Sequence, residues 1–273
     1  MKVKSDFAEV NGARLYYERS GHGKPLVMIH AGIADCRMWD KEFEAFSQSH
    51  QALRFDMRGY GRSMPAEGEF NLLDDLETLL AKLDIPKPMI LMGCSMGGGL
   101  SIDYALTHPA HVKALILVGS DPAGLELDAP WPDELVAQSE SAFEAGDVDL
   151  VAELDMRIWF DGDGRTSDEV DSHARRKAYA MAKLVTEHEL KGIGTHVRKS
   201  VARPAAERLP ELTMPALIVI GQNDLPYLKL AADYMRDKLP AATKLLIPDA
   251  GHLPNLEHPE LFRTAVLDFL GDC

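Results

Sequence analysis

The sequence contains little cysteine and too few basic residues to balance its acidic ones. Its three cysteines, Cys36, Cys94 and Cys273, cannot all pair in disulfides and lack the spacing of metal ligands. With a formal net charge of −14, the chain also lacks the basic excess that binds nucleic-acid phosphates. These shortages predict a reduced, cytoplasmic protein that binds neither a metal nor a nucleic acid.

Long hydrophobic runs are absent as well. No apolar segment approaches the roughly 18 residues needed to span a bilayer. The first residues, MKVKSDFAEV, carry no apolar stretch after their lysines, so we expect neither a signal peptide nor a membrane partner. A content of 46% hydrophobic and 26% charged residues is that of an ordinary soluble globular protein, and it leaves the oligomeric state open.

The chain does contain short apolar runs that alternate with longer amphipathic ones. Buried strands are predicted at 25–30, 51–57, 88–93, 112–119, 215–221 and 243–248, and helices at 72–83, after Ser95, at 228–239 and at 259–270. Residues 13–25 resemble an antiparallel edge strand that ends in a glycine turn. This alternation predicts an α/β fold with a mostly parallel central sheet flanked by helices.

One long segment interrupts the alternation. Residues 123–206 show no convincing buried strand, and their charged, helical-looking sequence is punctuated by proline and glycine. We therefore predict a core made of residues 1–122 and 207–273, with residues 123–206 inserted between two of its strands as a helical unit.

The pentapeptide GCSMG at 93–97 matches G-x-S-x-G, with a predicted strand before it and a predicted helix after it. In such a turn the serine, here Ser95, is a candidate nucleophile. The Met96 N–H group then lies at the positive end of the helix, where it can bind a developing oxyanion. By itself, the pentapeptide fits equally well a glycine-rich turn around a buried serine.

A serine nucleophile needs a base and an acid that orients the base. Among ten histidines, His252 lies in the loop DAGHLPN directly after a predicted strand, at the sheet edge where active sites assemble. Asp224 follows the preceding strand in IGQNDLP, and Asp121 in VGSDPAG is its rival. We favour Asp224 because it preserves the order serine, aspartate, histidine.

A second oxyanion donor should come from the loop after an earlier strand. The stretch His30-Ala31-Gly32-Ile33 follows the predicted strand 25–30, and its small residues allow backbone N–H groups to approach a ligand. Each of these loops is a weak signal, but together they place all the required groups at one edge of the sheet.

The chain resembles the α/β-hydrolase fold proteins along nearly its whole length. The matching stretches are HAGIADCRMW at 30–39, DMRGYGRS at 56–63, GCSMGGG at 93–99, GQNDLP at 221–226 and DAGHLPNLEHPE at 249–260. The resemblance implies a triad of Ser95, Asp224 and His252, with the Gly32 and Met96 N–H groups as the oxyanion hole. Ala31 stands where the family more often has glycine.

The resemblance also assigns roles outside the triad. It implies that the turn containing Asp56, Arg58, Gly59 and Gly61 is scaffold, and that the insertion is a cap that sets substrate choice. We take Ile33, Trp159 and Phe160 as candidate pocket residues, although at least half of the apolar group Met156, Ile158, Trp159 and Phe160 should only pack the cap onto the core.

The function predicted from the sequence is a serine hydrolase without cofactor or metal. It would cleave a small carboxylic ester or lactone through an acyl-enzyme. A serine nucleophile argues against haloalkane dehalogenases and epoxide hydrolases, which the resemblance associates with aspartate. A C–C bond hydrolase or a cofactor-free perhydrolase with the same triad remains open, as does a ligand-binding, receptor-like protein that kept the fold.

Overall fold

The computed structural model describes residues 2–63, 70–192 and 204–272. Its centre is an eight-stranded sheet in the order β1-β2-β4-β3-β5-β6-β7-β8. The strands are β1 Lys4–Val10, β2 Ala13–Ser20, β3 Lys24–Ile29, β4 His50–Phe55, β5 Met89–Cys94, β6 Val112–Val118, β7 Ala216–Gly221 and β8 Ala242–Ile247. The pairs β1–β2 and β2–β4 are antiparallel and every other pair is parallel, so the α/β fold predicted from the sequence is confirmed.

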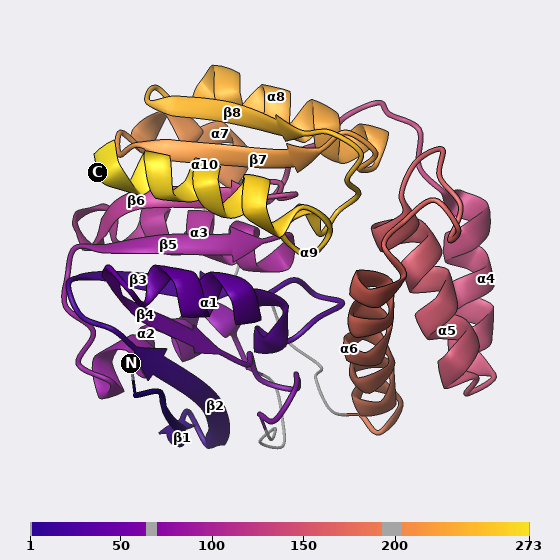
Figure 1. Cartoon of the computed structure of the whole chain (residues 1–273), viewed down its shortest axis with the longest axis horizontal. Coiled ribbons are helices and arrows are strands. Elements are labelled where there is room, and N and C mark those ends of the chain that lie inside the picture. The colour runs from indigo at the N-terminus through magenta and orange to yellow at the C-terminus, as the bar shows by residue number, and fades with distance from the viewer. Residues whose placement is uncertain (1, 64–69, 193–203, 273) are drawn as a thin grey trace.

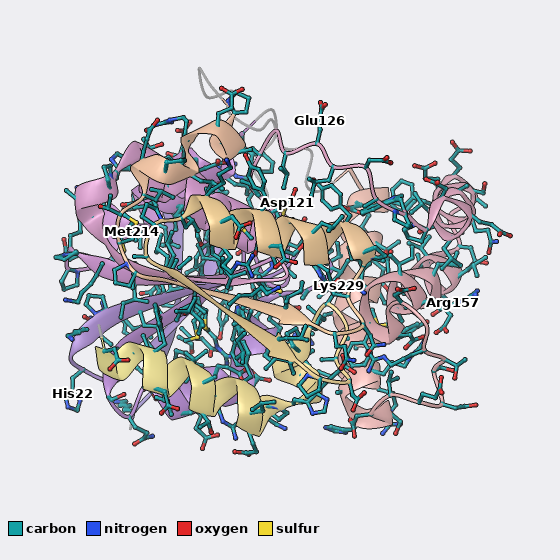
Figure 2. All side chains as sticks on the ribbon, turned by 90° about the horizontal axis from the view of Figure 1, so that it is seen from above. His22, Asp121, Glu126, Arg157, Met214 and Lys229 are labelled. Atoms are coloured by element: carbon teal, nitrogen blue, oxygen red, sulfur yellow. The ribbon has the colours of Figure 1, made fainter. Side chains whose placement is uncertain are left out.

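Helices cover both faces of this sheet (Figure 1). They are α1 Asp40–Phe46, α2 Leu72–Lys82, α3 Met96–Thr107, α4 Asp133–Glu144, α5 Val148–Asp155, α6 Ser172–Leu190, α7 Ala205–Arg208, α8 Pro226–Lys238, α9 Pro254–Glu257 and α10 Pro259–Asp272. Shorter helical segments are η1 Cys36–Trp39, η2 Pro109–His111, the π-helix η3 Met156–Asp161 and η4 Leu209–Glu211. Helices α2, α3 and α8 pack on one face and α1 and α10 on the other, and Figure 2 shows α8 and α10 on opposite sides of the strands.

The inner strands form because their side chains are apolar on both faces. Strands β5 and β7 are buried at every position, as expected for parallel strands covered by helices on both sides. Helix α2 begins at Leu72, as predicted, and the Asn71 side chain caps it by accepting a hydrogen bond from the Leu73 N–H at 2.8 Å.

The sequence reading was wrong about the sheet edge. The antiparallel strand expected within residues 13–25 is present as β2 and is followed by Gly21 and Gly23, but it is paired on both sides, with β1 and with β4. On this side of the sheet the edge strand is β1. It was missed because most of its side chains are exposed, so its sequence lacks the alternation of a half-buried strand.

Between β6 and β7, the residues that the structure describes form helices and no strand. Helices α4, α5 and α6 lie beyond the ends to which the parallel strands point (Figure 1). Met156 and Phe160 of η3 and Met181 of α6 are buried in the same apolar cluster as the inner strands, which seats these helices on the core. Within 2–63, 70–192 and 204–272, no helix is both long and apolar enough to cross a membrane.

One fully buried carboxyl lies between α1 and the segment after β8. Glu42 is 0% exposed, and its Oε2 accepts a hydrogen bond from Asn255 Nδ2 at 3.4 Å. Burial raises the pKa of Glu42 from 4.5 to about 7, because the charged form loses its hydration. Between pH 4.5 and about 7 the folded chain therefore holds this proton more tightly than the unfolded chain does.

Stability should consequently fall as the pH rises through this window. Glu42→Gln is neutral at every pH. The free energy of unfolding of this variant relative to the wild type should therefore be about 2 kcal/mol higher at pH 8 than at pH 5.5. Urea denaturation at the two pH values measures the difference. Glu44→Gln, an exposed glutamate on the same helix, is the matched control. If Glu42→Gln changed the free energy of unfolding equally at both pH values, the raised pKa of Glu42 would be contradicted.

Candidate active site

Ser95 lies in a strained turn between β5 and α3. Its backbone has φ 51° and ψ −119°, which a residue with a side chain adopts only when the surrounding structure imposes it. A side chain at Gly93 would overlap the carbonyl group of Gly97, and one at Gly97 would overlap the carbonyl groups that end β3. The glycines on either side of Ser95 are thus required by the close approach of α3 to the strand ends.

His252 and Asp224 form a buried pair. His252 Nδ1 lies 3.0 Å from Asp224 Oδ2 and 3.2 Å from Oδ1, and the two side chains are 2% and 1% exposed. The carboxylate also accepts a hydrogen bond from the Leu225 N–H at 2.8 Å. Because a carboxylate accepts, Nδ1 carries the proton of a neutral imidazole, and Nε2 is left free to accept one. The rival acid Asp121 instead lies 3.4 Å from the Tyr227 hydroxyl.

Contacts on both sides of Ser95 bring its turn beside this pair. The Cys94 thiol lies 3.8 Å from the carbonyl oxygen of His252. On the other side, the Ser95 N–H donates to the Val118 carbonyl at 2.8 Å, and the next residue is Gly119. A Cβ at Gly119 would lie 2.8 Å from His252 Nδ1 and 3.2 Å from Asp224 Oδ2. Gly119 is therefore a site residue that the sequence reading missed, since a lone glycine at a strand end looks like an ordinary turn.

The loop after β3 approaches the same place. A Cβ at Gly32 would lie 3.9 Å from the Met96 side chain, so the two predicted oxyanion donors are neighbours. His30 fixes this loop: its Nε2 accepts from the Met57 N–H at 2.9 Å, and its Nδ1–H donates to the Ala31 carbonyl at 2.8 Å. Burial lowers the pKa of His30, which keeps the imidazole neutral, as accepting a hydrogen bond requires.

The three candidate pocket residues lie in different surroundings. The Trp159 ring is partly exposed, and its centroid is 4.9 Å from that of His252. Ile33 belongs to the loop after β3 and is partly buried against the apolar cluster of the inner strands. Phe160, also named as a pocket candidate, is instead 0% exposed and packs in the apolar cluster of the inner strands.

A cavity of about 290 Å³ lies between the insertion and the start of α8. Trp131 and Ile158 line it from the insertion, and Leu225, the residue after Asp224, lines it from the core. The Trp131 ring contacts Trp159 with centroids 6.0 Å apart, which connects the cavity wall to the ring that covers His252. Arg157, labelled in Figure 2, is an exposed charged group of its lining.

The turn at 56–61 is structural. The Asp56 carboxylate accepts hydrogen bonds from the Cys36 and Arg62 N–H groups, both at 2.8 Å. Arg58, 2% exposed, pairs with Asp75 of α2 at 2.7 Å. These buried contacts hold the loop after β4 against η1 and α2. They are consistent with the scaffold role that the family resemblance implies.

Asp35, Cys36 and Asp56 are the one group of potential metal ligands within the described ranges. Their donor atoms are poorly suited to a cation. Asp35 is engaged by Arg37 at 2.6 Å, and both Asp56 oxygens accept backbone hydrogen bonds. Burial also raises the pKa of the Cys36 thiol, so the thiolate that would bind a metal is disfavoured.

The packing of Gly119 gives a test of the site. Gly119→Ala should destabilise the fold by about 3 kcal/mol or more. The positive φ strains the backbone of an alanine, and the added methyl group also displaces the buried His252–Asp224 pair. Gly146 also has a positive φ, 73° against 52° at Gly119, but a Cβ there would meet nothing within 4 Å, so Gly146→Ala should cost about 1 kcal/mol of backbone strain alone. Urea denaturation measures both, and equal losses would mean that Gly119 does not contact the pair.

Three features are together typical of one class of protein: the order of the strands, the strained turn at Ser95 and the His252–Asp224 pair. Residues 24–259 match the model of the alpha/beta hydrolase fold, and the chain belongs to this family. It is 28% identical to the pimeloyl-[acyl-carrier protein] methyl ester esterase of Nitrosomonas europaea, across 92% of this chain and 97% of that protein. It is 25% identical to the 2-hydroxy-6-oxo-6-(2'-aminophenyl)hexa-2,4-dienoic acid hydrolase of Metapseudomonas resinovorans, across 97% and 90%.

Solved structures agree with this fold. A thermophilic esterase from Thermogutta terrifontis superposes with a TM-score of 0.77 at 23% identity, covering 98% of each chain. At that identity the likeness concerns the fold alone.

Proposed function

We propose that this chain is a serine hydrolase that cleaves a small carboxylic ester or lactone through an acyl-enzyme, with Ser95, His252 and Asp224 as its triad. The observation that carries the proposal is the buried His252–Asp224 pair, 3.0 Å apart, beside the strained turn of Ser95. A strained backbone and a buried polar pair both cost stability, and they persist together where chemistry requires them. The esterase of Nitrosomonas europaea supports an ester substrate.

The reaction begins when His252 Nε2 takes the hydroxyl proton of Ser95 and Oγ attacks the substrate carbonyl. The N–H groups of Gly32 and Met96 bind the resulting oxyanion. As the C–O bond to the leaving group breaks, the imidazolium returns the proton to the departing alkoxide, and the acyl group stays on Ser95. For a lactone, the new hydroxyl remains on the same acyl chain.

Water completes the cycle. His252 removes a proton from water, the hydroxide attacks the acyl carbonyl, and the proton passes to Ser95 Oγ as the acid leaves. Asp224 stays ionised throughout, and it orients the imidazole and stabilises its charged form. No cofactor takes part in these steps.

The helical insertion at 123–206 acts as the cap in this proposal. Trp159 covers the imidazole, and the cavity bordered by Trp131, Ile158 and Leu225 supplies apolar space for part of the substrate. The size of this space fits a small molecule. Turnover of p-nitrophenyl esters from acetyl to decanoyl would measure the acyl length that it accepts.

The nucleophile is tested by Ser95→Ala. Turnover of p-nitrophenyl acetate should fall roughly 10³-fold or more, since no other group can form the acyl-enzyme. Ser101→Ala, at a buried serine in α3 just after this turn, should keep wild-type turnover. Undiminished hydrolysis by folded Ser95→Ala would refute the proposed function.

The acid is tested by comparing the two aspartates. Asp224→Asn should lower kcat by about 10³- to 10⁴-fold, because an amide favours the wrong imidazole tautomer and leaves the imidazolium unpaired. Asp121→Asn should leave kcat near the wild-type value. If Asp121→Asn proved the damaging change in this ester assay, the assignment of the acid would be reversed.

A second function rests on the relative from Metapseudomonas resinovorans, which is named as a dienoic acid hydrolase. The same triad can hydrolyse a C–C bond next to a ketone, provided that the leaving carbon is protonated. A wild-type protein that turns over such a dienoate, but no ester from acetyl to decanoyl, would favour this alternative.

A further inference from the structure

A short piece of the insertion is bonded to both loops that hold the acid and the base. The His252 N–H donates to the Trp159 carbonyl at 3.0 Å. On the neighbouring loop, the Asp163 N–H donates to the Asn223 carbonyl at 2.7 Å, and Asn223 Nδ2 donates to the Asp163 carbonyl at 3.1 Å. Residues 159–165 therefore connect the loop of Asp224 to the loop of His252.

Arg165 is the centre of this connection. Its side chain is 10% exposed, and all of its N–H groups have acceptors. Nε and Nη2 donate to the carbonyls of Asp161 and Phe160, at 2.8 and 3.0 Å. Nη1 donates across to the Asp249 carbonyl at 2.6 Å, and both Nη atoms bind the Glu257 carboxylate, at 2.8 and 3.2 Å.

Glu257 carries the contact to the residue before the base. Its side chain is 3% exposed, and Oε1 accepts a hydrogen bond from the Gly251 N–H at 2.6 Å. Arg165 thus reaches the segment before His252 at two points, directly at Asp249 and through Glu257 at Gly251. Burial raises the pKa of Glu257 and Arg165 opposes that rise, so the carboxylate depends on this guanidinium.

We propose that Arg165 is a positioning residue for the triad, which sets the place of His252 through Glu257 and the backbone of 249–252. This inference rests on the proposed function of Ser95, His252 and Asp224. A base must stay within hydrogen-bond reach of Ser95 Oγ, of the leaving group and of water in turn, and small displacements are costly. The insertion therefore contributes to the chemical step as well as to substrate choice.

Arg165→Ala in the full chain tests the proposal with p-nitrophenyl acetate. We expect kcat to fall about 10- to 100-fold with KM unchanged, because substrate contacts are intact while the imidazole is misplaced. Guanidinium chloride, added well below unfolding concentrations, should restore part of kcat by refilling the site, and sodium chloride should not. If Arg165→Ala does not fold, Arg165→Lys, which keeps the charge but not the planar fork, is judged by its kcat and KM in the same way.

Arg175→Ala is the matched control. Arg175 is also largely buried in the insertion, but it pairs with Glu153 and with Asp161, both within the insertion. Its loss should lower the free energy of unfolding and leave kcat unchanged. Wild-type kcat in Arg165→Ala, a rise in KM alone, or an equal kcat loss in Arg175→Ala would overturn the positioning role.

Ser95→Ala in the same assay separates this proposal from the proposed function. If its turnover is lost while Arg165→Ala keeps full kcat, only the positioning role fails. If Ser95→Ala turns over like the wild type, the triad itself is wrong.

Discussion

The structure depends on how closely the first turn of α3 approaches the ends of β3 and β6. Gly97 lies against the carbonyls of Ile29 and His30, and Gly98 lies where a side chain would overlap the hydroxyl of Ser120. With so little room, the chain passes from β5 into α3 only through a sharp turn, and the residue at its apex takes the positive φ of Ser95. Packing of α3 against the central sheet therefore holds the backbone strain at Ser95.

Most of the fold and the main loops of the site were predictable from the sequence, because both leave local signals. Apolar runs such as ALIVIG of β7 report burial on two faces, and the glycines around Ser95 report a close approach. Sequence order then favoured Asp224 over Asp121, and in the structure His252 pairs with Asp224.

The features that were missed leave no local signal. Strand β1 is paired on one side and largely exposed, so its side chains show no period. Gly119 matters only because His252, far along the sequence, comes within contact of it. Phe160 shows a related limit, since an apolar residue has the same identity in a pocket wall and in a core.

The ion pairs that the insertion buries also leave no local signal in its charged sequence. The Asp161 side chain is only 3% exposed and that of Arg165 is 10% exposed. Asp161 pairs with Arg175 at 2.7 Å, and Arg165 pairs with Glu257 of α9 at 2.8 Å, which compensates for lost hydration. Some charged residues of this segment thus form buried ion pairs, and these pairs exist only in one folded arrangement of the chain.

The order in which the site's parts occur along the chain has a consequence for biosynthesis. During synthesis, Ser95 and the loop after β3 leave the ribosome well before His252 and Glu257 do. The contacts of Arg165 with Glu257 span 92 positions, and those of Cys94 with His252 span 158. All eight strands precede His252 in the chain, so a nascent chain can form the sheet before the His252–Asp224 pair exists.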